Sequence, residues 1–125
     1  MNATQDPRMK LHLPATLAAW TSPHFVTVFK REFEALSAGV LPLQQALAHS
    51  SAVADEAFQA ILIASEANAE SLVLKVGVMY EGIIAGCNCA DDPSPPATQT
   101  EYCVLILRID RVGAAASVAL DTDSL

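Results

Sequence analysis

The chain has few positive charges. Its 125 residues include 7 Lys and Arg against 14 Asp and Glu, which gives a formal net charge of −7. Proteins that bind nucleic acid use cations to neutralise phosphates, so this balance argues against a nucleic-acid partner. Hydrophobic residues are plentiful at 52% and charged residues are only 17%, a combination that excludes intrinsic disorder. The length predicts one domain with one hydrophobic core.

Long apolar runs are also missing. The two longest stretches without charge, residues 11–29 and 35–54, are both interrupted by Pro, His and Ser. A membrane-spanning helix needs about 20 mostly apolar residues, so neither stretch is predicted to cross a membrane. Residues 2–7 are polar, and Pro14 breaks the apolar segment that follows Lys10, which is not the pattern of a secretory signal. We therefore expect a cytoplasmic protein whose cysteines are reduced.

Catalytic motifs are absent as well. The chain has no Gly-rich phosphate loop, no Gly-x-Ser-x-Gly, no His-Glu-x-x-His and no EF-hand pattern. His12, His24 and His49 lie far apart, and none has a Cys or a carboxylate at a spacing that local structure brings into contact. The sequence thus favours a protein that is not an enzyme.

The best-marked element is a helix that begins after Ser22. Ser is a favoured N-cap, and Pro23 suits the first helical turn. Three of the four Phe follow at helical spacing: Phe25, Phe29 and Phe33. Such a stripe is more typical of a core face than of a ligand-binding wall. Gly39 is predicted to end the helix in a left-handed conformation.

Shorter helices are expected at residues 14–20 and after Pro42. Before them, residues 1–12 are predicted to be a loose leader, and residues 13–125 a single domain.

Strand patterns dominate after Ala54. The predicted strands cover residues 58–64, 71–89, 101–110 and 114–121. A single straight strand over 71–89 would be about 60 Å long, so a bend or bulge is expected at Gly77 or Gly82. Residues 110–113 fit a type I turn.

This order of elements predicts an α+β fold. One N-terminal helix, or two, would pack on a four-stranded antiparallel sheet. Long bent strands around a helix suggest a cystatin-like arrangement, which is an analogy of fold and implies no function.

The three cysteines flank one proline-rich loop. If this loop closes a hairpin with Cys87 opposite Cys103, then Cys89 lies opposite Glu101 and the three sulfurs share one face. Three thiolates and a carboxylate could hold zinc in tetrahedral geometry, or the thiols could carry redox chemistry. A shift of the register by one residue would destroy the cluster. The candidate metal ligands are Cys87, Cys89, Cys103, Asp91, Asp92 and Glu101.

The cysteines also have a simpler interpretation. A buried Cys behaves as a small hydrophobe, and Cys103 alternates with Leu105 and Leu107. Adjacent residues of an extended segment point apart, which argues against a catalytic pair formed by Asp91 and Asp92.

Two hypotheses about function follow. The first is a small non-enzymatic accessory or binding protein that acts as a homodimer. Both faces of the predicted sheet are partly apolar, and one helix layer covers only one of them, so the other face should meet a partner or a second copy. The second is a metal-binding or thiol-redox protein centred on Cys87, Cys89 and Cys103.

Overall fold

A computed structural model of the protein describes residues 9–48, 50–54, 56–84 and 97–121. The strands are β1 (Met9–His12), β2 (Ala52–Val53), β3 (Gln59–Ala67), β4 (Ser71–Ile84), β5 (Ala97–Asp110) and β6 (Ala115–Leu120). The helices are α1 (Pro14–Ala18) and α2 (Phe25–Glu34), followed by two 3₁₀ helices, η2 (Ala38–Val40) and η3 (Gln44–Ala46).

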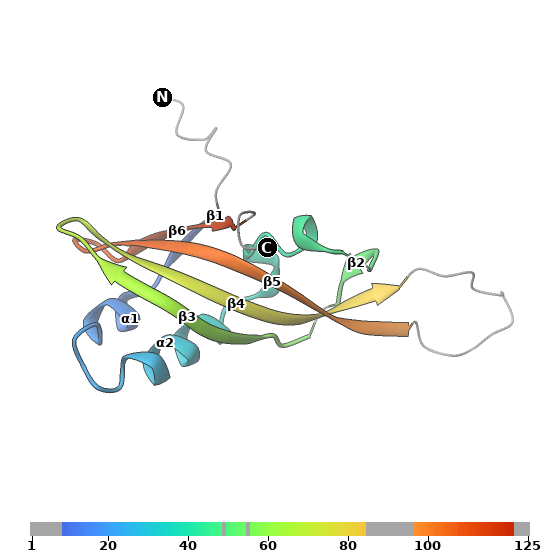
Figure 1. Ribbon diagram of the computed structural model, residues 1–125, viewed down its shortest axis with the longest axis horizontal. Helices are drawn as coiled ribbons and strands as arrows, with labels where there is room; N and C mark the ends of the chain where they lie inside the picture. Colours follow the sequence, from blue (N-terminus) through green and yellow to red (C-terminus); the bar gives the residue numbers. More distant parts are fainter. Residues whose placement is uncertain (1–8, 49, 55, 85–96, 122–125) are drawn as a thin grey trace, which may run out of the picture.

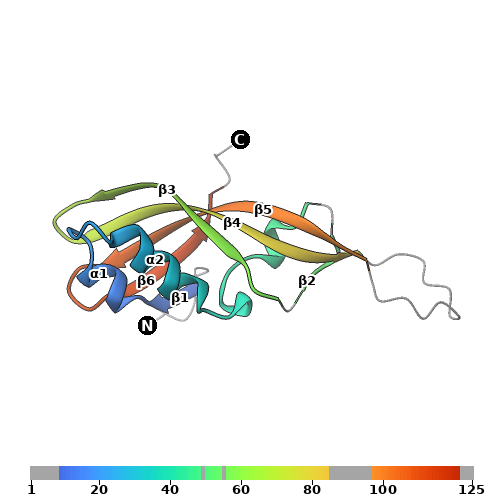
Figure 2. The ribbon, with the colours of Figure 1, turned by 90° about the horizontal axis from the view of Figure 1, so that it is seen from below.

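The strands form one antiparallel sheet. Its order is β1-β6-β5-β4-β2, and β3 pairs with the same edge of β4 as β2 does. Strands β4 and β5, each 14 residues long, pair over their whole length and form the spine of the molecule (Figure 1). Helices α1 and α2 lie together on one side of this sheet (Figure 2). The α+β class is confirmed, whereas the predicted count of four strands is too low, because the short strands β1 and β2 add to the sheet.

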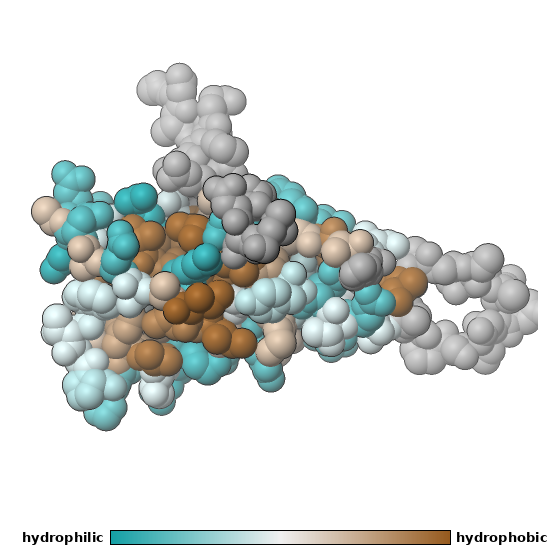
Figure 3. Space-filling view, viewed as in Figure 1, coloured by the Kyte–Doolittle hydropathy of each residue, from teal (hydrophilic) through white to brown (hydrophobic). Residues whose placement is uncertain are grey.

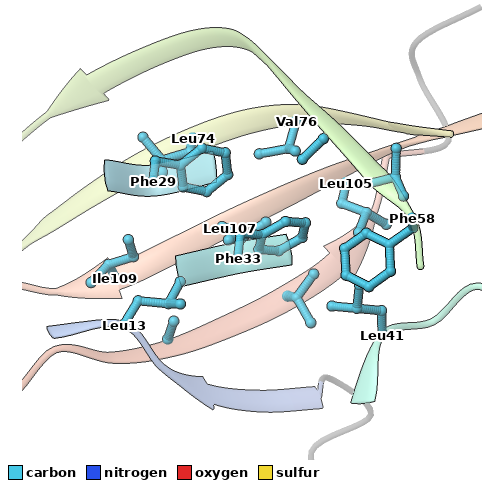
Figure 4. Close-up of a cluster of buried hydrophobic side chains, with 14 of the residues drawn as sticks. Leu13, Phe29, Phe33, Leu41, Phe58, Leu74, Val76, Leu105, Leu107 and Ile109 are labelled. Atoms are coloured by element: carbon cyan, nitrogen blue, oxygen red, sulfur yellow. The ribbon is translucent and has the colours of Figure 1, made fainter. Parts of the chain in front are cut away.

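The core lies between α2 and the side of the sheet that we call the inner face. Phe29 and Phe33 are fully buried and their rings stack with centroids 5.2 Å apart, while Phe58 meets Phe33 edge-on at 5.7 Å (Figure 4). The interpretation of the Phe stripe as a core face is therefore confirmed. The inner face consists of Leu72, Leu74, Val76, Val78 and Tyr80 on β4 and of Glu101, Cys103, Leu105, Leu107 and Ile109 on β5.

The N-terminal prediction is wrong in part. Residues 9–12, expected in a loose leader, form β1 and pair with β6 from Met9–Val118 to His12–Ala115. The Nε2 atom of His12 also lies 2.9 Å from the carbonyl oxygen of Gly113. Residues 1–8 of the predicted leader lie outside the described part of the chain.

Helix α2 ends earlier than predicted. Its last residue is Glu34, and Gly39 lies in η2 without a positive φ. The Ser37 Oγ accepts a hydrogen bond from the Gly39 N–H at 3.2 Å and so caps the 3₁₀ turn that contains Gly39. Short 3₁₀ turns of this kind are common after α-helices.

Two acidic residues of α2 fix the neighbouring elements. The Glu32 carboxylate accepts hydrogen bonds from the backbone N–H groups of Ala15 and Thr16, at 3.0 and 2.7 Å, and so caps the first turn of α1. The Glu34 carboxylate accepts the N–H of Ala60 on β3 at 2.8 Å, while Lys30 Nζ donates to the carbonyl oxygen of Ala60 at 2.6 Å. The Lys30–Glu34 pair therefore holds both backbone polar groups of one residue at the edge of the sheet.

The bulge predicted at Gly77 or Gly82 is not found at either glycine of β4. Strand β4 runs through both Gly77 and Gly82, and the bulge lies in β3 between Leu62 and Ala64. A Cβ atom at Gly77 would collide with the ring of Tyr102, and one at Gly82 would collide with the side chain of Ser50. Both glycines thus make room for a neighbouring side chain.

The predicted turn at residues 110–113 is present. The Asp110 carbonyl oxygen accepts the N–H of Ala114 at 2.8 Å, and the Asp110 side chain accepts the N–H of Val112 at 2.9 Å. The left-handed residue is Ala114, with φ of 63°, rather than Gly113.

Candidate functional site

The cysteine hypothesis requires Cys87 to lie opposite Cys103, and the register of β4 and β5 tests this. Cys103 pairs with Val78, and Glu101 pairs with Tyr80. The predicted opposition of Cys103 to Cys87, and of Glu101 to Cys89, is therefore wrong. The two strands pair as far as Ile84 and Ala97, so about 20 Å of strand separates Cys103 from the last described pair.

Four of the candidate ligands cannot be placed by the structure. Cys87, Cys89, Asp91 and Asp92 lie outside the described residues. Within the described ranges, no group of three His, Cys, Asp or Glu side chains is arranged to hold a metal ion. Metal binding by the full set of six residues stays a prediction.

The two described candidates, Cys103 and Glu101, do share one face with each other. They lie two residues apart on the inner face, where Tyr80 is the cross-strand neighbour of Glu101. All three are buried, and Glu101 is only 3% exposed. A carboxylate at this depth needs hydrogen-bond donors, and the backbone N–H of Ala48 supplies one at 3.0 Å.

The segment between α2 and β3 covers this polar end of the inner face. Tyr80 Oη donates to the Leu43 carbonyl oxygen at 2.9 Å. The Gln44 side chain closes the segment on itself, because its Nε2 donates to the Ser51 carbonyl oxygen at 3.1 Å and its Oε1 accepts the Val53 N–H at 3.3 Å. These bonds tie the covering segment to the sheet.

This environment disfavours the thiolate form of Cys103. Burial raises its pKa to about 11, and the nearby charge of Glu101 adds to the rise. Burial likewise raises the pKa of Tyr80, with further contributions from Cys103 and Glu101. Reactive cysteines have lowered pKa values next to positive charge, so Cys103 is suited to core packing and not to thiol chemistry.

The opposite side of the sheet has a different character. We call it the outer face, and no described helix lies over it (Figure 2). Apolar side chains gather near its middle (Figure 3). The outer face consists of Ser71, Val73, Lys75, Gly77, Met79 and Glu81 on β4, of Thr100, Tyr102, Val104, Ile106, Arg108 and Asp110 on β5, of Gln59, Ile61, Ala64 and Glu66 on β3 and of Ser117 and Ala119 on β6.

Tyr102 is the most prominent of these side chains. Its ring lies against Gly77, and it is 52% exposed. Ile61, which pairs with Gly77 from the other side, is 47% exposed. An aromatic ring and a branched aliphatic side chain thus flank Gly77 on this face, whereas the neighbouring Val104 is only 9% exposed.

The charges of the outer face have a simple distribution. Near its middle, Lys75 Nζ and Asp121 Oδ2 are 3.6 Å apart, which joins β4 to the residue after β6. Arg108 lies toward one end, where its Nη1 donates to Ser71 Oγ at 3.2 Å. Glu81 lies toward the other end, where its Oε2 accepts a hydrogen bond from Thr100 Oγ1 at 2.9 Å.

Sequence reasoning anticipated that both sheet faces would be apolar, but it missed the contact between Gly77 and Tyr102. The available signal was a Gly in the middle of an alternating strand, which indicates a close approach as well as a bend.

Comparison of the chain with family models, curated proteins and solved structures finds no match. In the part of the chain that the structure describes, no helix has the length and apolar character needed to span a membrane. The interpretation of the site therefore depends on its geometry.

Proposed function

We propose that this chain is a non-enzymatic binding protein that acts as a homodimer, in which the outer faces of two sheets pack against each other. The observation that carries the proposal is the half-exposed Tyr102 ring near the half-exposed Ile61, on a sheet face that none of the described helices covers. A contiguous apolar patch of this kind is typical of protein interfaces, and Tyr is among the residues that contribute most to binding.

The size of the outer face leaves room for a second copy as the occupant. The strands β3, β4, β5 and β6 lie side by side from Val73 to Val76, where the face is about 19 Å wide, whereas neither β3 nor β6 is paired at the row of Glu81. Over the length of about 30 Å from Val73 to Glu81, the flat area is therefore roughly 450 Å² before the relief of the side chains is counted, compared with about 800 Å² on each partner of a standard interface.

The charge of the face also fits self-association. The chain as a whole carries a net charge of −7, which would keep two copies apart. Among the described residues, the outer face has two basic side chains, Lys75 and Arg108, and four acids, Glu66, Glu81, Asp110 and Asp121, so its net charge of 2 − 4 = −2 opposes self-association less than that of the whole chain. Its centre is apolar, and packing it against a copy buries little unpaired charge.

The test is the mass of the protein in solution. Light scattering at micromolar concentration is expected to give twice the 13.2 kDa of one chain. Tyr102→Glu should raise the dimer dissociation constant by about 30-fold or more, which corresponds to the loss of about 2 kcal/mol at a central contact.

The matched control is Val112→Glu, which adds the same charge at a residue that is 93% exposed in the β5–β6 turn, away from the outer face. This variant should dimerise as the unaltered chain does. A wild-type protein that is monomeric up to tens of micromolar would overturn the proposal.

A cytoplasmic location is part of the same proposal and is in keeping with the acidic composition of the chain. A cystatin-like course of the strands remains a hypothesis about the fold alone.

A further inference from the structure

Strand β5 is paired along the whole of one edge and along only part of the other. The first edge pairs with β4 over all 14 residues of β5. The second edge pairs with β6 from Leu105 to Ile109, and the Asp121 N–H then donates to the Val104 carbonyl oxygen at 2.8 Å. At residues 97–103 no described strand pairs with this second edge, and β4 is the strand beside β5 (Figure 1). We call this part the open edge of β5.

The backbone groups that point to the open edge follow from the alternation of the strand. In an antiparallel strand, successive residues direct their N–H and C=O groups to opposite neighbours. Val104 bonds toward β6, on the side of the open edge. The residues two, four and six positions before it, Tyr102, Thr100 and Thr98, therefore direct their N–H and C=O groups to that edge. No described residue is hydrogen-bonded to these groups, which we call the edge groups and which span about 13 Å of strand.

The open edge lacks the features that keep the edges of a sheet from pairing with another strand. Those features include a very short strand, a bulge, a proline and a charge that pairing would bury. Residues 97–103 keep an unbroken register with β4 and contain no Pro, Lys or Arg. Their one charged side chain, Glu101, is already only 3% exposed on the inner face, so an added strand buries no further charge. The edge of β3 differs, because Lys30 and Glu34 bond to Ala60 there and a bulge follows.

The side chains beside the edge groups suit a neighbouring strand. Thr98 and Thr100 are exposed β-branched residues and Tyr102 is an exposed aromatic residue, and these types favour cross-strand contacts. The Tyr102 ring lies against Gly77 of β4, so it leans away from the open edge. Strand addition takes its affinity from backbone hydrogen bonds and its specificity from the side chains beside them.

We propose that the open edge binds an extended segment of a partner protein as an added strand, and that this segment carries a Lys or Arg opposite Thr100. The backbone edge differs from the sheet face proposed for the homodimer, so this proposal does not rest on that one. The charge near the edge identifies the kind of partner.

The charge around the open edge is negative. The sequence contains no Lys or Arg between Lys75 and Arg108, and Lys75 is paired with Asp121 at 3.6 Å. The Glu81 carboxylate accepts a hydrogen bond from the Thr100 hydroxyl at 2.9 Å, which directs it toward β5. A residue opposite Thr100 in an added strand would lie two strand spacings, about 10 Å, from Glu81. The long side chain of a Lys or Arg there spans that gap, and the opposite charges attract.

A second copy of the chain fits this edge less well. If two open edges paired antiparallel about Thr100, the two Glu81 residues would lie on one face of the joined sheet, three strand spacings or about 14 Å apart. Each copy also brings a net charge of −7. Lys30, which reaches the sheet at Ala60, is already paired with Glu34 at 2.8 Å. A basic partner neutralises this charge, whereas a second copy adds to it.

Amide hydrogen exchange followed by NMR tests whether the edge is open. At low protein concentration, the amides of Gln99 and Glu101, which face β4, should exchange at least about 100-fold more slowly than the amides of the edge groups. Equal protection of both sets would show that the edge is occupied within the chain, and would overturn the proposal.

The probe for the partner is a peptide of about seven residues with blocked ends, in which Thr and Val alternate around one central Lys. Saturating peptide should slow the exchange of the edge groups by about tenfold or more and leave the exchange of Gln99 and Glu101 unchanged. The matched peptide with Glu in place of Lys should bind at least about tenfold more weakly. Glu81→Gln should reduce this preference for the Lys peptide.

Two substitutions at one position separate the backbone contact from the side chain. Thr100→Pro removes an edge N–H without removing a hydrogen bond to β4, so an unfolding curve should show that the fold is retained. Thr100→Val loses the same hydroxyl but keeps the N–H. The Lys peptide should therefore bind Thr100→Val at least about tenfold more tightly than Thr100→Pro. If Thr100→Pro does not fold, the exchange data on the unaltered chain decide.

The proposal is overturned if millimolar Lys peptide leaves the exchange of the edge groups unchanged, if the Glu peptide binds as tightly, or if folded Thr100→Pro and Thr100→Val bind alike. It is also overturned if the edge groups become protected as the protein concentration rises without peptide, because a second copy then occupies the edge. A monomeric wild type overturns the homodimer and leaves this proposal unchanged.

Discussion

The Tyr102 ring lies so close to Gly77 that any side chain at position 77 would displace it. The colliding atoms belong to the far end of the Tyr side chain, which can rotate away. The contact therefore determines where the ring stands on the outer face more than it determines whether the sheet forms.

Gly77→Ala should separate these two effects. We expect the free energy of unfolding to change by no more than about 1 kcal/mol, because the ring can move, while the dimer dissociation constant rises. Urea unfolding and sedimentation equilibrium measure the two quantities. Gly113→Ala is the matched control, since a Cβ there meets nothing within 4 Å. In a Tyr102→Ala background the effect of Gly77→Ala on dimerisation should disappear, and its persistence would contradict the role given to the ring.

Gly82→Ala should be more damaging to the fold. A Cβ at this position would collide with Ser50 and would approach the Glu101 Cγ to 3.2 Å, in the covered end of the inner face. Overpacking of this kind costs about 1 to 3 kcal/mol, to be measured by thermal or urea unfolding.

Ser50→Ala is expected to have little effect on stability or to raise it. Among the described residues, the buried Ser50 Oγ has no hydrogen-bond partner, so its removal relieves a desolvated polar atom. A loss of more than about 1 kcal/mol in urea unfolding would show that this hydroxyl has a partner in solution.

Cys103 should be slow to react in the native protein. In a variant with Cys87→Ser and Cys89→Ser it is the remaining thiol, and at pH 8 a disulfide reagent should modify it slowly in buffer and fully in denaturant. Because the pKa of Cys103 is raised by folding, its protonated thiol stabilises the folded state fully at pH values below the ordinary thiol pKa of about 8.5. This stabilisation is lost as the pH rises through about 11. Cys103→Ala should remove this part of the loss of stability at alkaline pH.

Rapid, stoichiometric modification of native Cys103 would contradict the core role and would revive the thiol hypothesis. A zinc determination on protein purified without chelator tests the metal hypothesis separately: one zinc per chain, lost in Cys87→Ser, would support it.

Glu34 should contribute to stability in a pH-dependent way. Burial raises its pKa, but the hydrogen bond from Lys30, the backbone bond from Ala60 and the charge of Lys30 outweigh this effect, and the net pKa is lowered. The stabilisation is therefore present above the ordinary carboxyl pKa and is lost as the pH falls through the lowered value.

Glu34→Ala leaves the Ala60 N–H without its acceptor and should cost about 1 to 2 kcal/mol at pH 7, with a smaller difference from wild type in acid. The exposed residue Glu56 provides the control: Glu56→Ala should alter stability by less than about 0.5 kcal/mol. A Glu34→Ala effect that does not shrink in acid would contradict the assignment.

The sequence predicted those features that depend on local periodicity. The Phe stripe of α2, the alternation of β5 and the turn after Asp110 are all encoded by residues a few positions apart. The features it missed depend on contacts between distant segments. Strand β1 forms because β6 offers it an edge, and the register of β4 with β5 follows from burial over 14 pairs, which the positions of the cysteines alone could not supply.

For the candidate site too, local periodicity was predictable from the sequence and contacts between distant segments were not. The alternation of apolar residues predicted that a second sheet face would be open, and the described part of the chain has that face. The contact of Tyr102 with Gly77 and the positions of Arg108 and Glu81 at opposite ends depend on the strand register, which a single sequence does not reveal.

The hydrogen bonds of Lys30 and Glu34 to the backbone of Ala60 limit edge-to-edge pairing between the sheets of two copies. A strand of another copy could not pair with β3 at Ala60, because the N–H and the carbonyl group of Ala60 are already hydrogen-bonded to side chains of α2. Edge-to-edge aggregation is therefore obstructed at this position. The same two side chains that join α2 to β3 therefore also protect this sheet edge against aggregation.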